Sequence, residues 1–223
     1  MCGRFTLANP AAAFNAMPWL RDIPPLAPRY NIAPGQMAFI LCDSPMPMVR
    51  SAHWGINKTW TSATTPYLIN ARSEKVLETP TFAQCFRHRR CVIPADGFYE
   101  WRKTATVSEP FLFQLTDSAP FCLAGLYDLS GDELNFVILT TTANSVVKPI
   151  HSRMPVIISP SAARSYISAP PDAAATRNFF QPYSAKYMNL RRVSSLVNRV
   201  ENDCRACMDV YEPPVDQQGS LFT

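Results

Sequence analysis

Arg89-Arg-Cys-Val-Ile-Pro-Ala-Asp-Gly-Phe-Tyr-Glu-Trp101 is the stretch that says most about the fold. Two short apolar runs, 91–93 and 98–101, flank the turn-forming segment 94–97, so the stretch predicts two strands paired as a hairpin. Glu100 stands among aromatic neighbours in the second run. A carboxylate buried there costs free energy unless it is paired or protonated. The stretch therefore predicts a β-rich core with a candidate acid inside it.

Further strands are predicted on both sides of this stretch. Apolar runs bounded by turn residues indicate strands over 37–42, 48–54, 67–72, 111–115, 121–127, 134–141 and 154–158. Short helices are predicted over 10–20, with Asn9 as N-cap, and over 74–77, 81–86, 159–164 and 172–180. The proline-punctuated segment 22–35 is expected to be an ordered loop. We predict an α+β fold, a single compact β-rich domain over 1–208 with short peripheral helices, followed by a C-terminal tail over 209–223.

The composition is that of an ordinary globular protein. Of 223 residues, 47% are hydrophobic and 17% charged, and no apolar run reaches the roughly 18 residues of a membrane span. The seven cysteines are scattered and odd in number, as expected for reduced thiols, and the start of the chain lacks a secretory pattern. We expect a soluble, cytoplasmic, monomeric protein. Its net charge of +4 permits an anionic partner without demonstrating one.

The sequence predicts neither a metal site nor a cofactor. Cys204-Arg-Ala-Cys207 has the spacing of a half-site for zinc, but no second pair or well-spaced histidine completes it. These two cysteines are therefore expected to be structural. A glycine-rich phosphate loop, a Gly-x-Ser-x-Gly elbow and a His-Glu-x-x-His helix are all missing from the sequence.

The amino-terminal pentapeptide Met1-Cys2-Gly3-Arg4-Phe5 offers an unusual nucleophile. If Met1 is removed, Cys2 carries an α-amine and a thiol, whose ordinary pKa values are about 7.7–8.0 and about 8.5. Such an aminothiol attacks an aldehyde as an amine and then closes a thiazolidine through sulfur. It can also act as an N-terminal nucleophile with its own amine as base. The alternative, an ordinary small apolar cysteine, is favoured by the pentapeptide alone.

Three other segments carry candidate chemistry, and each has a structural alternative. His151 is either a general acid/base or a loop histidine bonded to backbone. Glu100 is either an acid with a raised pKa or the partner of Arg102 or of the basic cluster 87–90. Asn70 and Arg72 alternate along an extended segment and so face one side. They offer a ligand an amide and a cation, or they are a turn residue and a solvated cation.

Arginines and tryptophans together suggest a platform for single-stranded nucleic acid. Cations follow phosphates while aromatic faces stack on bases, although most tryptophans in a chain of this size belong to the core. The candidates are Arg4, Arg29, Arg72, Arg87, Arg89, Arg90, Arg153, Trp54, Trp60 and Trp101.

Seven ordered blocks carry a resemblance to a known family. They are 1–5 (Met-Cys-Gly-Arg-Phe), 29–34 (Arg-Tyr-Asn-Ile-Ala-Pro), 54–55 (Trp-Gly), 69–74 (Ile-Asn-Ala-Arg-Ser-Glu), 89–101, 150–155 (Ile-His-Ser-Arg-Met-Pro) and 193–198 (Val-Ser-Ser-Leu-Val-Asn). Over roughly residues 1–200 the chain resembles the SOS response-associated peptidase (SRAP) family. The resemblance implies a compact α+β domain around a barrel-like β core, and a sensor and shield for abasic sites in single-stranded DNA.

The resemblance also implies roles for individual residues. Cys2 matches the nucleophile that forms a thiazolidine crosslink with the ring-opened sugar, and Asn70 matches the residue that positions it. Glu100 matches the acid/base of ring opening, and His151 the partner in imine formation and crosslink reversal. Phosphate contacts are implied for Arg4, Arg72 and Arg153. The segment 54–60 departs from the family pattern, because it lacks the usual proline between Trp54 and Trp60.

Three functions are therefore kept, in this order. The first is a covalent binder of abasic single-stranded DNA. The second is an N-terminal-nucleophile peptidase or hydrolase that uses Cys2, Glu100 and His151. The third is a plain single-strand-binding module with an inert Cys2. We expect the first to act in the cytoplasm and to associate with the nucleoid when bound to DNA.

Overall fold

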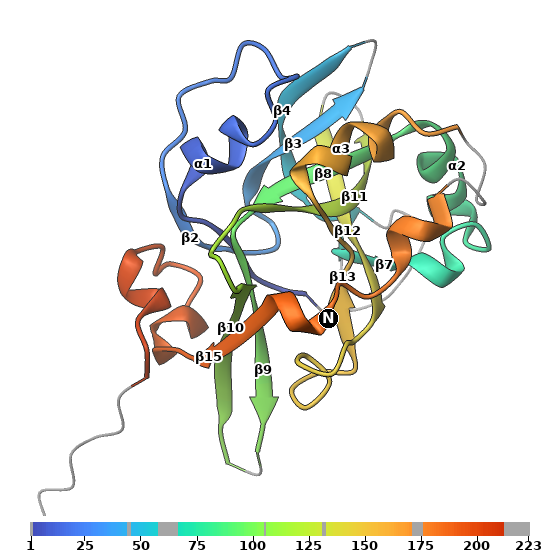
Figure 1. Ribbon diagram of the computed structural model, residues 1–223. Helices are drawn as coiled ribbons and strands as arrows, with labels where there is room; N and C mark the ends of the chain where they lie inside the picture. Colours follow the sequence, from blue (N-terminus) through green and yellow to red (C-terminus); the bar gives the residue numbers. More distant parts are fainter. Residues whose placement is uncertain are drawn as a thin grey trace, which may run out of the picture.

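Strands dominate the computed structural model, which describes residues 2–43, 46–57, 67–104, 106–130, 133–170 and 176–211. Five of them close into a small barrel at the centre of the molecule (Figure 1). Around the barrel the order is β12 (Glu133–Thr142), β4 (Pro47–Trp54), β3 (Met37–Asp43), β8 (Arg90–Ala95) and β11 (Phe121–Ser130). Pairing of β11 with β12 closes the ring, and only the β12–β4 pair in it is parallel. The barrel-like core is confirmed.

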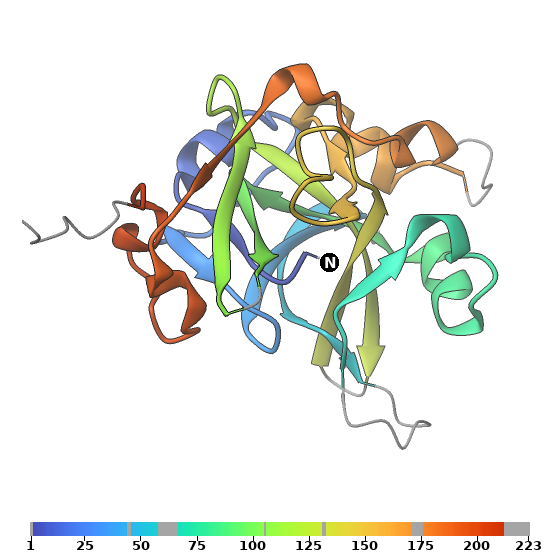
Figure 2. The same cartoon turned by 90° about the horizontal axis from the view of Figure 1, so that it is seen from below.

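A second, five-stranded sheet stands against the barrel. Its order is β15 (Met188–Arg192), β10 (Ser108–Leu115), β9 (Gly97–Lys103), β1 (Phe5–Leu7) and β2 (Arg29–Ile32). The shorter strands are β5 (Ile56–Asn57), which pairs with β6 (Tyr67–Leu68), and three strands added to the barrel sheet, β7 (Asn70–Arg72), β13 (Arg153–Pro155) and β14 (Ile157–Ile158). The amino-terminal segment lies between the two sheets, in the middle of the view in Figure 2.

The short helices are α1 (Pro10–Asn15), α2 (Pro80–His88) and α3 (Pro160–Ile167), with 3₁₀ turns η1 (Ser73–Lys75), η2 (Arg177–Phe180), η3 (Ala185–Tyr187), η4 (Ser195–Asn198) and η5 (Arg205–Met208). The three α-helices and η1 pack on the barrel, whereas η4 and η5 pack on the second sheet. Each α-helix begins with proline, whose fixed φ suits the first helical position. Asn9 caps α1 as predicted, since its Oδ1 accepts a hydrogen bond from the Ala12 amide at 3.0 Å. This helix ends at Asn15, earlier than expected.

The predicted hairpin over 91–101 is wrong. Strands β8 and β9 follow each other directly but belong to different sheets. Asp96 lies at the corner between them, and its carboxylate accepts hydrogen bonds from Thr6 Oγ1 at 2.5 Å and from the Asn9 amide at 2.7 Å. At Gly97 a Cβ atom would lie 2.8 Å from Thr6 Oγ1. The segment therefore forms a corner between the two sheets that is stabilised by contacts with β1. The sequence around 91–101 gives no sign of these contacts, because β1 lies about 90 residues earlier in the chain.

Other elements differ from prediction for similar reasons. The expected loop over 22–35 contains β2, and the expected strand over 154–158 divides into β13 on β12 and β14 on β11. The helix expected over 74–77 is only the 3₁₀ turn η1, while β1 and β15 were not predicted. The predictions for Met1, Trp60 and parts of the turn at 43–47, the helix at 172–180 and the tail fall outside the described residues.

The C-terminal segment is tied to the start of the chain through Asn31. This side chain has no exposed surface, and its Nδ2 donates to the carbonyls of Val197, Arg199 and Asn202 at 3.2, 2.9 and 2.8 Å. The Asp203 carboxylate accepts from the Tyr30 and Asn31 amides and pairs with Arg29. The block 29–34 therefore anchors residues 197–203.

We expect Asn31→Ala to lower the free energy of unfolding by about 2–4 kcal/mol, because it leaves buried carbonyls unpaired. Urea denaturation followed by circular dichroism measures this change. The matched control is Asn15→Ala at an exposed position, which should change stability by less than about 0.5 kcal/mol. Equal effects of the two substitutions would show that the Asn31 bonds do not hold the C-terminal segment.

Candidate active site

Cys2 is held beside β9 by backbone pairing. The Tyr99 amide donates to the Arg4 carbonyl at 3.0 Å, and Phe5 pairs with Phe98 at the start of β1. This pairing places the amino-terminal segment beside β9, the strand that carries Glu100. Cys2 has no exposed surface, and its Sγ lies 3.8 Å from the Arg4 carbonyl oxygen. Burial, and then the nearby negative charge of Glu100, raise the pKa of the Cys2 thiol far above its ordinary value.

Asn70 reaches the same residue from the barrel side. Strand β7 runs parallel to β12, with Asn70 opposite Ile138. The Asn70 Nδ2 donates to the Cys2 carbonyl at 2.9 Å. Its Oδ1 is buried and accepts no hydrogen bond from the part of the chain that the structure describes. Asn70 therefore holds the Cys2 carbonyl through Nδ2, while its acceptor atom Oδ1 has no partner among the described residues.

Glu100 is a buried acid next to Cys2 and His151. Only 4% of the residue is exposed, and burial raises the pKa of its carboxyl, a shift that the positive charge of His151 partly opposes. His151 Nδ1 accepts a hydrogen bond from the Arg153 amide at 2.9 Å. The same Nδ1 lies 3.2 Å from the Arg153 carbonyl oxygen, so the Arg153 backbone holds the ring in place. Glu100 and His151 are thus two candidate acid/base groups close to each other.

An open groove of about 560 Å³ passes over these groups. It is lined by Arg4, Glu100, Trp101, Lys103, Ser108, His151 and Asn198. Trp101 forms part of its wall, since its Nε1 donates to Asn198 Oδ1 at 2.7 Å and the Arg4 guanidinium lies 5.7 Å from its ring centre. The predicted residues Cys2, Asn70, Glu100, His151, Arg4 and Trp101 thus gather in one place.

The remaining predicted DNA contacts lie elsewhere. Arg153 binds both carboxylate oxygens of Glu74, at 2.6 and 2.8 Å, and the Thr140 carbonyl at 2.6 Å, so both terminal nitrogens of its guanidinium are occupied. Arg72 is exposed at the end of β7. Trp54 has no exposed surface, and its ring packs in the core 5.2 Å from Phe5. A base-stacking role for Trp54 does not fit this burial.

The basic cluster at 87–90 also proves to be partly structural. Arg90 is buried and donates to the carbonyls of Tyr166, Phe86 and Ala169, while Arg89 pairs with Asp128. Arg90 is therefore a core cation, and Arg89 is a partly exposed cation held in an ion pair. Sequence reasoning missed Lys103, Ser108 and Asn198 in the groove, although Asn198 closes one of the seven blocks.

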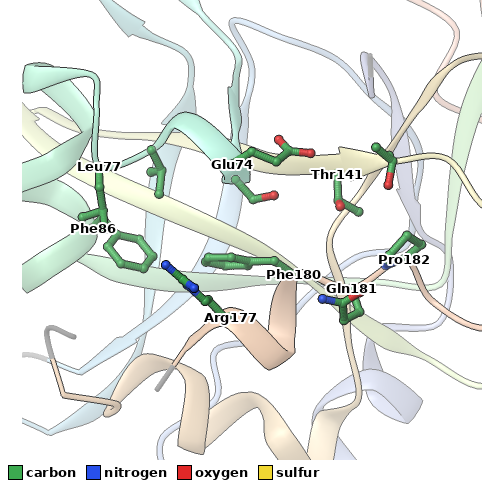
Figure 3. Close-up of a pocket in the computed structure, with 11 residues that line it drawn as sticks. Glu74, Leu77, Phe86, Thr141, Arg177, Phe180, Gln181 and Pro182 are labelled. Carbon is green, nitrogen blue, oxygen red and sulfur yellow. The ribbon is translucent and has the colours of Figure 1, made fainter. Parts of the chain in front are cut away.

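A second cavity of about 450 Å³ lies between η1, α2 and η2. Figure 3 shows the side chains of Phe86, Phe180 and Arg177 gathered at one end of it. Glu74, the partner of Arg153, also lines this cavity. Glu100 and His151 line the groove and not this cavity, whereas Cys2 and Asn70 are lining residues of neither.

Two kinds of feature are absent from the described residues. They contain no group of three or more histidine, cysteine or acidic side chains placed to hold a metal ion. Among their helices, none has the length and apolar character needed to cross a bilayer.

The comparison with protein families is decisive. The model described as SOS response associated peptidase (SRAP) matches residues 1–200. The chain belongs to this family. Within the SRAP family it is 34% identical to the abasic site processing protein YoaM of Bacillus subtilis, over 94% of this chain and 98% of that protein.

More distant SRAP relatives agree. The abasic site processing protein YedK of Escherichia coli is 32% identical over 75% of this chain and 79% of its own length. The HMCES protein of Xenopus tropicalis, also named an abasic site processing protein, is 24% identical over 81% of this chain and 65% of its own. A crystal structure of a Bacteroides thetaiotaomicron protein superposes with a TM-score of 0.77 at 22% identity, covering 94% of this chain and all of that one, which shows a shared fold.

Proposed function

We propose that this protein recognises abasic sites in single-stranded DNA and becomes covalently joined to them through Cys2 after Met1 is removed. The observation that carries the proposal is the hydrogen bond from Asn70 to the Cys2 carbonyl beside the buried Glu100. The relatives named as abasic site processing proteins support the choice of substrate. In this proposal the protein shields the lesion, working as a monomer in the cytoplasm.

The form of the sugar that reacts is the minor, ring-opened form, which is an aldehyde. Protonated Glu100 donates to the ring oxygen and assists opening, and the α-amine of Cys2 then attacks the aldehyde carbon. Loss of one water gives an imine, and addition of the thiol across the C=N bond closes a thiazolidine. His151 takes up and returns the protons that these steps move, and Asn70 Oδ1 accepts a hydrogen bond from the attacking amine. No cofactor is needed.

The groove supplies contacts for the DNA strand. The Arg4 guanidinium lines the groove 5.7 Å from the centre of the Trp101 ring, and there it can donate to a phosphate. Trp101 offers an aromatic edge beside it, and exposed Arg72 extends the positive charge. Arg153 can reach a phosphate only by leaving Glu74.

We expect Glu74→Gln to tighten binding to single-stranded DNA by about two- to fivefold, because an ion pair near the surface is worth about 0.2–1 kcal/mol and its loss loosens the hold of the exposed Glu74 side chain on the largely buried Arg153. Fluorescence anisotropy with an undamaged oligonucleotide measures the affinity. Glu78→Gln, also exposed, removes the same charge without touching Arg153. If both substitutions tighten binding equally, net charge alone explains the gain and Arg153 makes no phosphate contact.

The central test mixes purified protein with an abasic oligonucleotide and no reductant. The expected product survives heating in detergent, and its mass equals the sum of the protein without Met1 and the DNA, minus one water. A product that appears only after borohydride treatment would contradict ring closure by the thiol. Active protein that retains Met1 would contradict the mechanism as a whole.

An N-terminal-nucleophile hydrolase is the second candidate, because the same Cys2, Glu100 and His151 suit it and because the family is described as a peptidase. Incubation with a peptide library in the absence of DNA separates the two functions. Repeated turnover of a peptide supports the hydrolase, and the absence of cleavage leaves covalent DNA binding as the activity of the site.

A further inference from the structure

Cys204 and Cys207 are placed by a hydrogen-bonded turn. Cys204 is the N-cap of η5, and the Cys207 amide donates to the Cys204 carbonyl at 3.0 Å. A turn closed between residues i and i+3 brings the two Cα atoms within about 7 Å. Disulfides span Cα distances of about 4.4–6.8 Å. The backbone therefore already holds the pair near the separation of a disulfide.

The two thiols differ in access. Cys204 is exposed, whereas Cys207 has no exposed surface and packs with Tyr99, Val193 and Val197. Both are free, and Cys207 Sγ donates to the Asn202 carbonyl at 3.2 Å with the Cys204 thiol within hydrogen-bonding reach. The other five cysteines of the chain are buried. An external reagent thus meets Cys204 first, with Cys207 directly behind it.

We propose that Cys204 and Cys207 form a thiol–disulfide modification site that reacts with small soluble disulfides. The Cys204 thiolate attacks one sulfur of the reagent, forming a mixed disulfide and releasing one reagent thiolate. Cys207 then loses its proton and attacks Cys204 Sγ, which forms the internal disulfide and releases the second thiolate. The two protein thiols are oxidised by two electrons in total, and the external disulfide is reduced to two thiols.

The pair lies behind a wall of the groove. Val197, which packs on Cys207, directly precedes Asn198, the hydrogen-bond partner of Trp101. A zinc half-site is the competing use of this spacing, but the described residues provide no third ligand. The inference is independent of the chemistry at Cys2 and stands whether or not the protein reacts with DNA.

Glutathione disulfide and the full-length protein test the proposal. After incubation, rapid acid quenching and intact-mass measurement, the wild-type protein is expected to lose two hydrogens, and peptide mapping should place the bond between Cys204 and Cys207. Dithiothreitol should restore the original mass. Cys207→Ser is expected to stop at a stable glutathione adduct on Cys204, and Cys204→Ser should form neither adduct nor internal bond.

The remaining outcomes overturn the proposal. These are a wild-type protein that keeps a stable glutathione adduct, one that does not react, or a Cys204→Ser variant that is oxidised as readily as the wild type. Because Cys207 is buried, its variant is first checked by thermal melting. If Cys207→Ser does not fold, the rate of Cys204 alkylation by iodoacetamide in the wild-type protein replaces it. Cys204 must then react at least tenfold faster than Cys207.

Discussion

Cys2→Ala is expected to abolish the heat-stable conjugate with abasic single-stranded DNA. Alanine keeps the α-amine, so an imine still forms, but without sulfur the ring cannot close and water returns the imine to amine and aldehyde. Denaturing electrophoresis of protein mixed with an abasic oligonucleotide measures the loss, which we expect to be complete. Cyanoborohydride should recover a conjugate from the same variant, because it reduces the imine to a stable amine.

Cys204→Ser is the matched control, since it removes the exposed thiol and leaves the groove unchanged. It should form as much conjugate as the wild-type protein. A heat-stable conjugate of Cys2→Ala without reductant would show that another nucleophile does the work. Failure of reductive trapping in that variant would show that the amine of residue 2 does not reach the aldehyde.

Glu100→Gln has the second largest expected effect, a fall of about 10²–10⁴-fold in the rate of conjugate formation, which is the usual contribution of a general acid or base. Glutamine keeps the shape of the side chain but cannot donate the proton that opens the sugar ring. Single-turnover measurements over a range of pH reveal the difference. The wild-type rate should fall as pH rises through the raised pKa of Glu100, and the variant should lack this fall.

The substitution Glu100→Gln is expected to have opposite effects on the reaction rate and on the stability of the fold. The folded pKa of Glu100 lies above its ordinary value, so its stabilising contribution is complete below the ordinary pKa and is lost as pH rises through the folded one. Glutamine does not ionise, and Glu100→Gln should therefore gain stability relative to the wild type over that pH window. Urea titrations at several pH values check this; an unchanged difference at all of them would contradict the raised pKa.

Glu109→Gln is the contrasting control for Glu100→Gln. Glu109 lies on the neighbouring strand β10 and pairs with Arg102 and Arg192, at 2.7 and 2.9 Å. Its replacement should lower stability and leave the rate of conjugate formation nearly unchanged. If both substitutions slow the reaction to the same degree, the acidic charge of the sheet matters in general and Glu100 is not the acid.

The strands were the predictable part of the fold. Runs such as 121–127 and 136–139 are apolar throughout because β11 and β12 are buried on both faces, and such runs carry a strong signal. Strand β1 has only three residues, Phe5–Leu7, and Phe5 pairs with Ile32 and Phe98, which come 27 and 93 residues later. The hydrophobic pattern of a three-residue segment does not predict pairing with strands so far along the chain. The same strand turns the expected hairpin at 94–97 into a corner.

The candidate site was likewise predictable in part. Asn70, Glu100 and His151 were chosen for their chemistry and their place in the blocks, and the structure brings them to Cys2 or to its groove. Burial was the property that the sequence did not reveal. Trp54 and Arg90 have the same side-chain chemistry as a nucleic-acid platform, yet both serve the interior. Only tertiary packing separates a core arginine from a phosphate-binding one.

The burial of Cys2 in the folded protein limits when Met1 can be removed. Asn70 and Glu100, which enclose it, leave the ribosome long after the amino terminus, and at about 5–20 residues per second Glu100 is made about 5–20 s later. An aminopeptidase needs an extended, accessible end of the chain. In the proposed mechanism, Met1 is therefore cut from the nascent chain during this interval. Molecules that fold before they are processed would stay permanently unreactive.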